Sequence, residues 1–128
     1  MAEGLRLMGE AQCLIYPSKW YETFGRLAVE AFATGTPVIA ANIGAIAEIV
    51  TPGHTGLHFP PGDPRDLARQ VTWMLTHSEQ QALMGRQARR EFEQKYTAAA
   101  NYAQLMAVYL RVLPAASFHQ NSAALTVL

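Results

Sequence analysis

The sequence predicts an α/β fold in which a small parallel sheet of about three strands is flanked by helices. Three short apolar runs, each adjoining a proline, alternate with segments whose apolar residues recur at helical spacing. The runs are continuous rather than alternating, which is typical of parallel strands that are buried on both faces. The 128 residues amount to one domain at most. Area scaling predicts that folding buries about two thirds of the unfolded surface, which is enough for a core.

The first half of the chain holds the predicted strands. They are expected at residues 13–16, 37–41 and 57–59. Helices are expected at residues 2–11, ending near Gln12, and at residues 25–34. A short helical turn through Glu48 is expected between the second and third strands. Gly35 is placed to end the second of these helices, and residues 52–56 have the composition of a turn.

The second half of the chain is predicted to be helical. Helices are expected from Pro64 to about His77, from Ser78 to about Lys95, and from Thr97 to Leu113. Asp63 and Pro64 are a strong helix start, because a side-chain acceptor precedes a ring that fixes φ. Ser78 and Gln81 have the spacing of a capping box. Residues 1–113 are therefore interpreted as one partial domain, and 114–128 as a loosely ordered tail.

Three strands are fewer than a complete doubly wound, Rossmann-like sheet requires, and no glycine-rich phosphate fingerprint follows the first strand. The fold is therefore expected to be a partial Rossmann-like one. One side of the sheet should lack a neighbour, which suggests a fragment or a chain that completes its sheet with a partner, including a second copy of itself.

Composition excludes several classes of function. Lys and Arg together number 10, as do Asp and Glu, so no basic field is available to hold nucleic acid or an anionic membrane. The longest apolar run, 105–110, is far shorter than the roughly 20 residues that a spanning helix needs. The lone Cys13 suits a reducing compartment, and the four histidines lack metal-ligand spacing. We expect a cytoplasmic protein without a metal or a transmembrane segment.

The most informative segment is the loop at 17–24, where the first strand leads into a helix that starts with glycine. Ligands of open α/β sheets bind at this kind of position. The first turn of a helix offers unpaired backbone N–H groups, and Gly25 would let a phosphate or sugar oxygen approach the backbone closely. A diphosphate would suit such a site.

Two acids, Glu22 and Glu30, lie eight positions apart on either side of this helix start. Carboxylates accept hydrogen bonds from hydroxyls, so sugar and ribose diols are natural partners for the pair. Taken singly, Glu22 is more simply interpreted as a solvated loop acid that interacts favourably with the helix dipole, and Glu30 as a surface helix acid. Glu30, however, lies in a segment that is apolar on nearly every face, which favours a role in a pocket or against a partner.

These residues resemble the second half of the nucleotide-binding domain of the group 1 (family 4) retaining glycosyltransferases, which have the GT-B fold. The resemblance covers about residues 12–113 and is carried by Pro17-Ser18, Glu22, Phe24-Gly25, Glu30-Ala31, Gly35-Thr36-Pro37-Val38-Ile39-Ala40, Gly44, Glu48 and Gly56-Leu57. Three positions depart from the family's common pattern, namely Thr23, Arg26 and Ala45.

The resemblance implies roles for the residues around the helix start. Its Glu-x7-Glu signature makes Glu22 the acid that binds the donor sugar and Glu30 the acid that binds the ribose. Donor-sugar contacts are implied for Glu22, Thr23, Phe24 and Gly25, and diphosphate contacts for Gly25, Arg26 and Leu27. The side chain of Arg26 could also simply point to solvent. The implied substrate is a UDP-, GDP- or ADP-sugar, with no cofactor.

The resemblance also implies that important parts lie outside this sequence. The family's acceptor domain, and the Arg and Lys that neutralise the leaving diphosphate, precede the segment that resembles this chain. The expected function is therefore that of a glycosyltransferase fragment that supplies half of a donor site and is inactive alone. The alternatives are a non-catalytic module that binds nucleotide sugars or a partner chain, and an unrelated α/β scaffold in which the two acids are structural.

Overall fold

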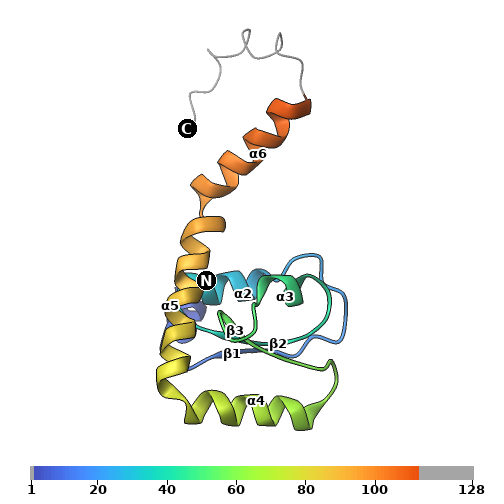
Figure 1. Cartoon of the computed structure of the whole chain (residues 1–128). Coiled ribbons are helices and arrows are strands. Elements are labelled where there is room, and N and C mark those ends of the chain that lie inside the picture. Colours follow the sequence, from blue (N-terminus) through green and yellow to red (C-terminus); the bar gives the residue numbers. More distant parts are fainter. Residues whose placement is uncertain (1, 113–128) are drawn as a thin grey trace. The chain divides into compact units, whose positions relative to one another are not determined.

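The computed structural model describes residues 2–112 (Figure 1). The elements are α1 (Ala2–Glu10), β1 (Leu14–Tyr16), α2 (Arg26–Ala33), β2 (Val38–Ala41), α3 (Gly44–Ile49), β3 (Gly56–Phe59), α4 (Pro64–Thr76), α5 (Ser78–Lys95) and α6 (Ala98–Val112). The predicted order of strands and helices is confirmed, with element ends within two residues of those expected. The predicted tail at 114–128 lies outside the described residues.

The chain divides into two compact units between Tyr96 and Thr97. The first unit holds the sheet and the helices up to α5. The second holds α6, whose start is capped because the Thr97 hydroxyl accepts a hydrogen bond from the amide of Ala100 at 3.2 Å. The domain boundary expected near residue 113 stays a prediction.

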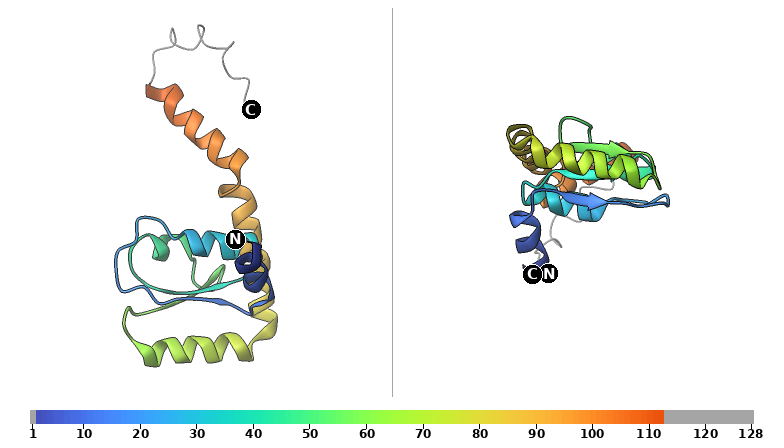
Figure 2. Two further views of the ribbon diagram at one scale, coloured as in Figure 1. Left: turned by 180° about the vertical axis from the view of Figure 1, so that it is seen from behind. Right: turned by 90° about the horizontal axis from the view of Figure 1, so that it is seen from below.

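The sheet has the strand order β1-β2-β3, and both pairs are parallel. Leu14 lies opposite Val38, which in turn lies opposite Gly56. Helices α2 and α3 cover one face of the sheet and α4 covers the other (Figures 1 and 2). Among the described residues β1 and β3 each have one neighbouring strand, so each is an edge. The predicted small parallel sheet flanked by helices is confirmed.

Strand β2 is buried on both faces, as its unbroken apolar run predicts. Val38 and Ala40 face a core shared with α2 and α3, and Ile39 and Ala41 face a second core shared with α4. All four side chains are completely buried. The alternation follows from the two-residue period of a strand.

The predicted start of α4 is confirmed. Asp63 is its N-cap, and its Oδ1 accepts hydrogen bonds from the amides of Arg65 at 3.0 Å and Asp66 at 3.1 Å. Pro64 occupies the first turn, where its missing N–H leaves no bond unmade.

The predicted capping box of α5 is wrong. The N-cap is His77, whose ring stacks on Trp73 of α4 with 4.4 Å between centroids. His77 is also the C-cap of α4, and its φ of −120° and ψ of 63° are not helical, so α5 begins at the next residue and Ser78 lies inside the helix. The side chain of Gln81 instead donates to the carbonyl of Gln12 at 2.7 Å, which ties α5 to the segment before β1.

His58 of β3 makes the stability of the fold depend on pH. Its Nε2 is buried and has no hydrogen-bond partner among the described residues. Burial lowers the pKa of His58 from its ordinary value of 6.5, and a hydrogen bond to the backbone of Val50 opposes the shift in part. The unfolded chain therefore takes up this proton at higher pH than the folded chain. The contribution of neutral His58 is present above pH 6.5 and is lost as the pH falls through the lower folded pKa.

We expect the free energy of unfolding to fall between pH 7.5 and pH 5, and to fall less in His58→Val, because that variant has no imidazole to protonate. Urea unfolding of wild type and of His58→Val at the two pH values measures the loss in each protein. The exposed His54 provides the control, and His54→Ala should keep the wild-type loss. An equal loss in His58→Val and wild type would assign the pH dependence to other groups.

Candidate functional site

The candidate site is the loop that joins β1 to α2, at the carboxyl edge of the sheet (Figure 1). β1 ends at Tyr16, and α2 begins after Gly25, its N-cap. The predicted site residues all lie in this loop or in the first turns of α2. They therefore occupy the sheet edge at which open α/β proteins bind ligands.

The carboxylate of Glu22 is held by hydroxyl groups. The hydroxyl of Tyr16 donates to its Oε2 at 2.8 Å, and Ser18 Oγ lies 3.4 Å from its Oε1. Burial, with the hydrogen bond and negative charge of Glu22, raises the pKa of Tyr16 to about 12. Tyr16 therefore keeps its proton and acts as a donor at neutral pH.

Gly44 places the loop segment that carries Glu22. Its φ is +60°, and a Cβ there would lie 3.2 Å from Tyr21 Cα and 3.3 Å from the Glu22 nitrogen. The amide of Ala45, next in α3, donates to the Glu22 carbonyl at 3.4 Å. Only glycine combines this conformation with so close an approach, so the start of α3 sets the position of the loop.

Gly25 has a structural role that its sequence context did not reveal. It is buried, and a Cβ there would lie 2.8 Å from Cδ1 of Ile46 and 3.3 Å from Cδ1 of Ile49, both on α3. Close packing between the start of α2 and α3 therefore requires glycine here, whether or not an anion approaches its backbone.

The amides at the start of α2 differ in availability. The Arg26 amide donates to the Phe24 carbonyl at 3.0 Å, whereas the Gly25 and Leu27 amides have no hydrogen-bond acceptor among the described residues. Unpaired N–H groups at a helix start attract anions. The backbone donors best placed for a diphosphate are therefore those of Gly25 and Leu27.

The side chains of Arg26 and Glu30 form an ion pair along α2. Arg26 Nε lies 3.0 Å from Glu30 Oε1, with 77% of the Arg26 side chain and 27% of the Glu30 side chain exposed. The sequence left two interpretations of the Arg26 side chain, contact with a diphosphate or exposure to solvent, and the structure adds a third, an ion pair with Glu30. Oε1 of Glu30 is engaged by the guanidinium, which leaves Oε2 for a further donor.

The other predicted residues are exposed. Phe24 packs the edge of its ring against Tyr96, at the end of α5, with 6.4 Å between centroids. Thr23 is exposed, and Leu27 is 45% exposed.

A hollow of about 250 Å³ lies along β1. It is lined by Leu14, Ile15, Tyr16, Pro17, Ser18, Glu22 and Leu27. Of the predicted site residues the hollow therefore brings together Glu22 and Leu27, whereas Glu30 is outside its lining.

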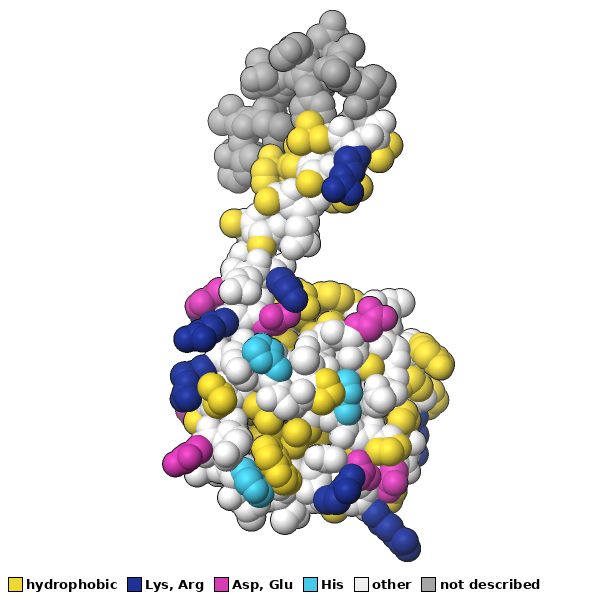
Figure 3. Space-filling view, viewed as in Figure 1, with side chains coloured by type: hydrophobic (Ala, Val, Ile, Leu, Met, Phe, Trp, Pro, Cys, Tyr) yellow, Lys and Arg dark blue, Asp and Glu magenta, His cyan; other side chains and the backbone are white. Residues whose placement is uncertain are grey.

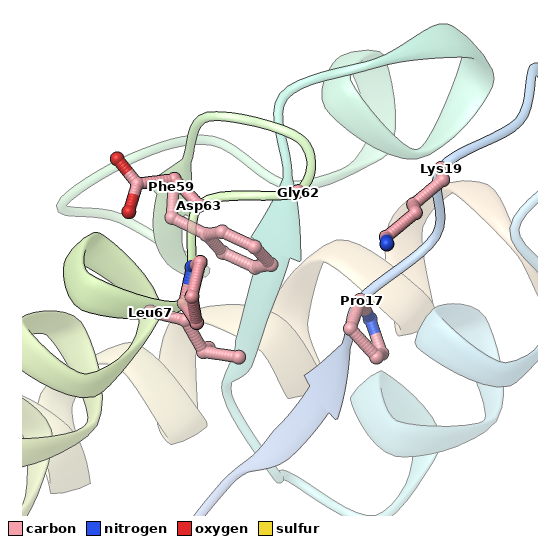
Figure 4. Close-up of a pocket in the computed structure, with 7 residues that line it drawn as sticks. Pro17, Lys19, Phe59, Gly62, Asp63 and Leu67 are labelled. Atoms are coloured by element: carbon pink, nitrogen blue, oxygen red, sulfur yellow. The ribbon is translucent and has the colours of Figure 1, made fainter.

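A second cleft, of about 200 Å³, lies between the ends of β1 and β3 (Figure 4). Pro17 and Lys19 form one wall, and Phe59 and Leu67 the other; the carboxylate of Asp63 points away from the gap. None of the residues predicted to bind the donor lines this cleft.

Sequence reasoning missed Tyr16 and Ser18 as partners of Glu22. The apolar run at 13–16 predicts only that Tyr16 ends a strand. Its position was the available signal, because a hydroxyl at the carboxyl end of a parallel strand lies where such sheets bind ligands.

Two other classes of site, a metal centre and a membrane-spanning helix, are absent between residues 2 and 112. Between 2 and 112, no group of three or more His, Cys, Asp or Glu side chains is arranged to hold a metal ion. In the same range no helix has the length and hydropathy to cross a membrane. On the face seen in Figure 3, acidic and basic side chains are interspersed.

The family is decided by comparison with known proteins. The family model described as "Glycosyl transferases group 1" matches residues 3–91, which is more than half of the chain. The chain belongs to the group 1 glycosyltransferases. The resemblance inferred from the loop and helix motifs is thus confirmed at the level of the family.

Relatives of this glycosyltransferase chain are much longer. A D-inositol 3-phosphate glycosyltransferase of Streptomyces bingchenggensis is 46% identical over 61 residues, which are 48% of this chain and 13% of that protein. The match to Alr3699/HepE of Anabaena in complex with UDP has a TM-score of 0.77 and 29% identity, covering 84% of this chain and 29% of that one. A structure of the same protein contains UDP-glucose.

Sucrose-phosphate synthase of Thermosynechococcus elongatus matches with a TM-score of 0.76 and 32% identity, over 83% of this chain and 26% of that one. The glycosyltransferase chain thus spans less than a third of each of these proteins. Its sheet and helices have the fold of GT-B glycosyltransferases, which confirms the predicted fold class.

Proposed function

We propose that this chain supplies half of the donor site of a glycosyltransferase that transfers a sugar from a nucleotide sugar with retention of configuration. Glu22 binds the donor sugar with Thr23, Phe24 and Gly25, and Glu30 binds the ribose. The observation that carries the proposal is the placement of two carboxylates around the start of α2, at the ligand edge of a group 1 glycosyltransferase fold. A structural relative contains UDP in one structure and UDP-glucose in another.

The diphosphate lies between the two acids and is bound by Gly25, Arg26 and Leu27. The amides of Gly25 and Leu27 supply hydrogen bonds, and the Arg26 guanidinium supplies charge. The donor is a UDP-, GDP- or ADP-sugar, and no cofactor takes part. The protein acts in the cytoplasm, where a free Cys13 stays reduced.

The chain alone does not turn over. Transfer breaks the bond between the anomeric carbon and the diphosphate oxygen, and the negative charge on the leaving group must be stabilised. Lys19 lies in the loop and Arg26 in the first turn of α2, and Arg26 is already paired with Glu30. The remaining cations and the acceptor domain belong to an upstream part of a longer parent.

The test is an NMR titration of the 128-residue chain with UDP and UDP-glucose, followed by GDP and ADP. We expect amide shifts confined to residues 21–31, around the loop and the start of α2. Unchanged spectra at millimolar ligand would contradict the donor half-site. Shifts spread over the whole first unit would point to nonspecific binding and would also contradict it.

The second candidate function is a non-catalytic module that completes its sheet with a partner chain. The observation that favours it is the edge of β1, where Ile15 is 42% exposed beside the hollow and no strand within residues 2–112 pairs on that side. An open parallel edge is a template for strand pairing. If the partner is a second copy, the chain self-associates and sedimentation shows a dimer. The Ile15→Lys variant, which places a charge on this edge, should then sediment as a monomer. A monomer at all concentrations argues against self-association.

A further inference from the structure

Tyr16 combines a buried ring with a hydroxyl directed at a predicted site residue. It is the last residue of β1, the residue is 8% exposed, and its ring packs in the core with α2 and α3. The phenol oxygen donates to Glu22 Oε2 at 2.8 Å. A buried phenol needs a partner for its O–H, and here that partner is an acid six residues further along the chain.

The two oxygens of Glu22 are not equivalent. Oε2 accepts the short bond from Tyr16, whereas Oε1 is 3.4 Å from Ser18 Oγ, close to the limit of a hydrogen bond. The same Ser18 hydroxyl lies 3.3 Å from the Trp20 carbonyl, so its single proton is shared between two acceptors. Oε1 is therefore the oxygen of Glu22 that a ligand hydroxyl can engage.

The hollow along β1 places this arrangement beside free space. Tyr16, Ser18 and Glu22 all line it. A carboxylate on a loop has several rotamers, and a short bond to a residue anchored in the core selects one of them. The remaining oxygen is then presented in a fixed direction.

We propose that Tyr16 is a positioning residue for Glu22. The Tyr16 hydroxyl fixes the Glu22 carboxylate through Oε2, so that Oε1 accepts a hydrogen bond from a hydroxyl of the donor sugar. The inference rests on the proposed function and extends it to a residue outside the predicted site. Tyr16 acts through Glu22 and does not touch the donor. Its pKa of about 12 is in keeping with this role, because the hydroxyl keeps its proton.

The test compares Tyr16→Phe with wild type in the full 128-residue chain. Dissociation constants for UDP and UDP-glucose are measured by NMR. The Kd of UDP divided by the Kd of UDP-glucose gives the contribution of the sugar to binding. We expect this ratio to fall about threefold to tenfold in Tyr16→Phe, while the affinity for UDP stays within about twofold. A hydrogen bond to a charged group is large enough to account for such a change.

Tyr21→Phe is the matched control. It makes the same chemical change five residues further along the chain, but Tyr21 is 82% exposed and its hydroxyl has no hydrogen-bond partner among the described residues. This variant should keep the wild-type ratio. A purely structural role of the Tyr16 hydroxyl would instead weaken UDP and UDP-glucose equally.

The dependence on Glu22 is tested by Glu22→Gln and by the double variant. If Tyr16 acts through Glu22, Tyr16→Phe has no further effect on the ratio once Glu22 is replaced. Independently of ligand, Glu22→Gln should lower the pKa of Tyr16 from about 12, as followed by the ¹³Cζ shift of its ring, because the carboxylate charge is removed.

The outcomes separate the inference from the proposed function. If wild type binds both ligands and Tyr16→Phe leaves the ratio unchanged, or weakens both equally, the positioning role is overturned and the donor site stands. If wild type binds neither ligand at millimolar concentration, the proposed function fails and this inference fails with it. Equal affinity of wild type for UDP and UDP-glucose overturns the sugar contact of Glu22, and with it the role of Tyr16.

Discussion

Glu30→Ala is expected to weaken UDP binding by about tenfold to a hundredfold and to leave the chain folded. The ribose diol would lose a charged acceptor, and a hydrogen bond to a charged group contributes about 1.5–3 kcal/mol. The ion pair that is lost with Glu30 involves an arginine that is 77% exposed, and such pairs contribute about 0–1 kcal/mol to stability. Dissociation constants from NMR, and the midpoint of urea unfolding, measure the two effects separately.

Two controls isolate the role of Glu30. Arg26→Ala removes the same ion pair but keeps the carboxylate, so it reports the effect of losing the pair and the guanidinium. Glu48→Ala removes an exposed acid from α3 and should change neither binding nor stability. Unfolding of Glu30→Ala would make Glu30 a structural residue, and unchanged UDP affinity would remove the ribose contact from the proposed site.

Gly56→Ala is expected to have the largest effect on stability. A Cβ at Gly56 would lie 1.8 Å from the Val38 carbonyl oxygen and 2.9 Å from Cγ1 of Val50. Gly56 pairs with Val38 in the parallel register of β2 and β3, so the carbonyl cannot move without disturbing that pairing. We expect a loss of about 3 kcal/mol or more, at the upper end of overpacking effects. For a unit of this size the melting temperature would fall by roughly 12 °C or more.

Gly4→Ala is the matched control for this substitution. Gly4 lies inside α1, and a Cβ there meets no atom within 4 Å. The same chemical change should therefore leave stability unchanged or raise it by up to about 1 kcal/mol, since alanine favours a helix over glycine. Thermal unfolding of the two variants side by side tests the prediction. Similar melting temperatures for both would contradict the close contact at Gly56.

Most of the fold could be predicted because its signals are local. The apolar run at 37–41 indicated a strand buried on both faces, and β2 is that strand. Asp63 and Pro64 indicated a helix start through groups that lie within one turn of each other, and the cap has the expected bonds. The capping box at Ser78 is wrong because the non-helical residue between α4 and α5 is His77, which caps both helices and leaves Ser78 inside α5.

The candidate site could be located but not built from the sequence. The spacing of Glu22 and Glu30 and the glycine before α2 marked the right loop. They did not show that Arg26 pairs with Glu30, or that Gly25 is required by Ile46 of α3. These contacts depend on side-chain rotamers and on the packing of one helix against another, which the order of residues alone does not specify.

The sequence by itself determined the elements of this protein, their order and the edge of the sheet that carries the site. Apolar runs, caps and turn residues act over a few positions, and parallel strands necessarily bring their carboxyl ends together. Only the tertiary structure decided which polar groups meet there. The loop that holds Glu22 is shaped by Gly44 of α3, which approaches it only when α3 has packed on the sheet. Tyr16 adjoins the loop in the sequence, but its ring is anchored beside Glu22 only once the core has formed.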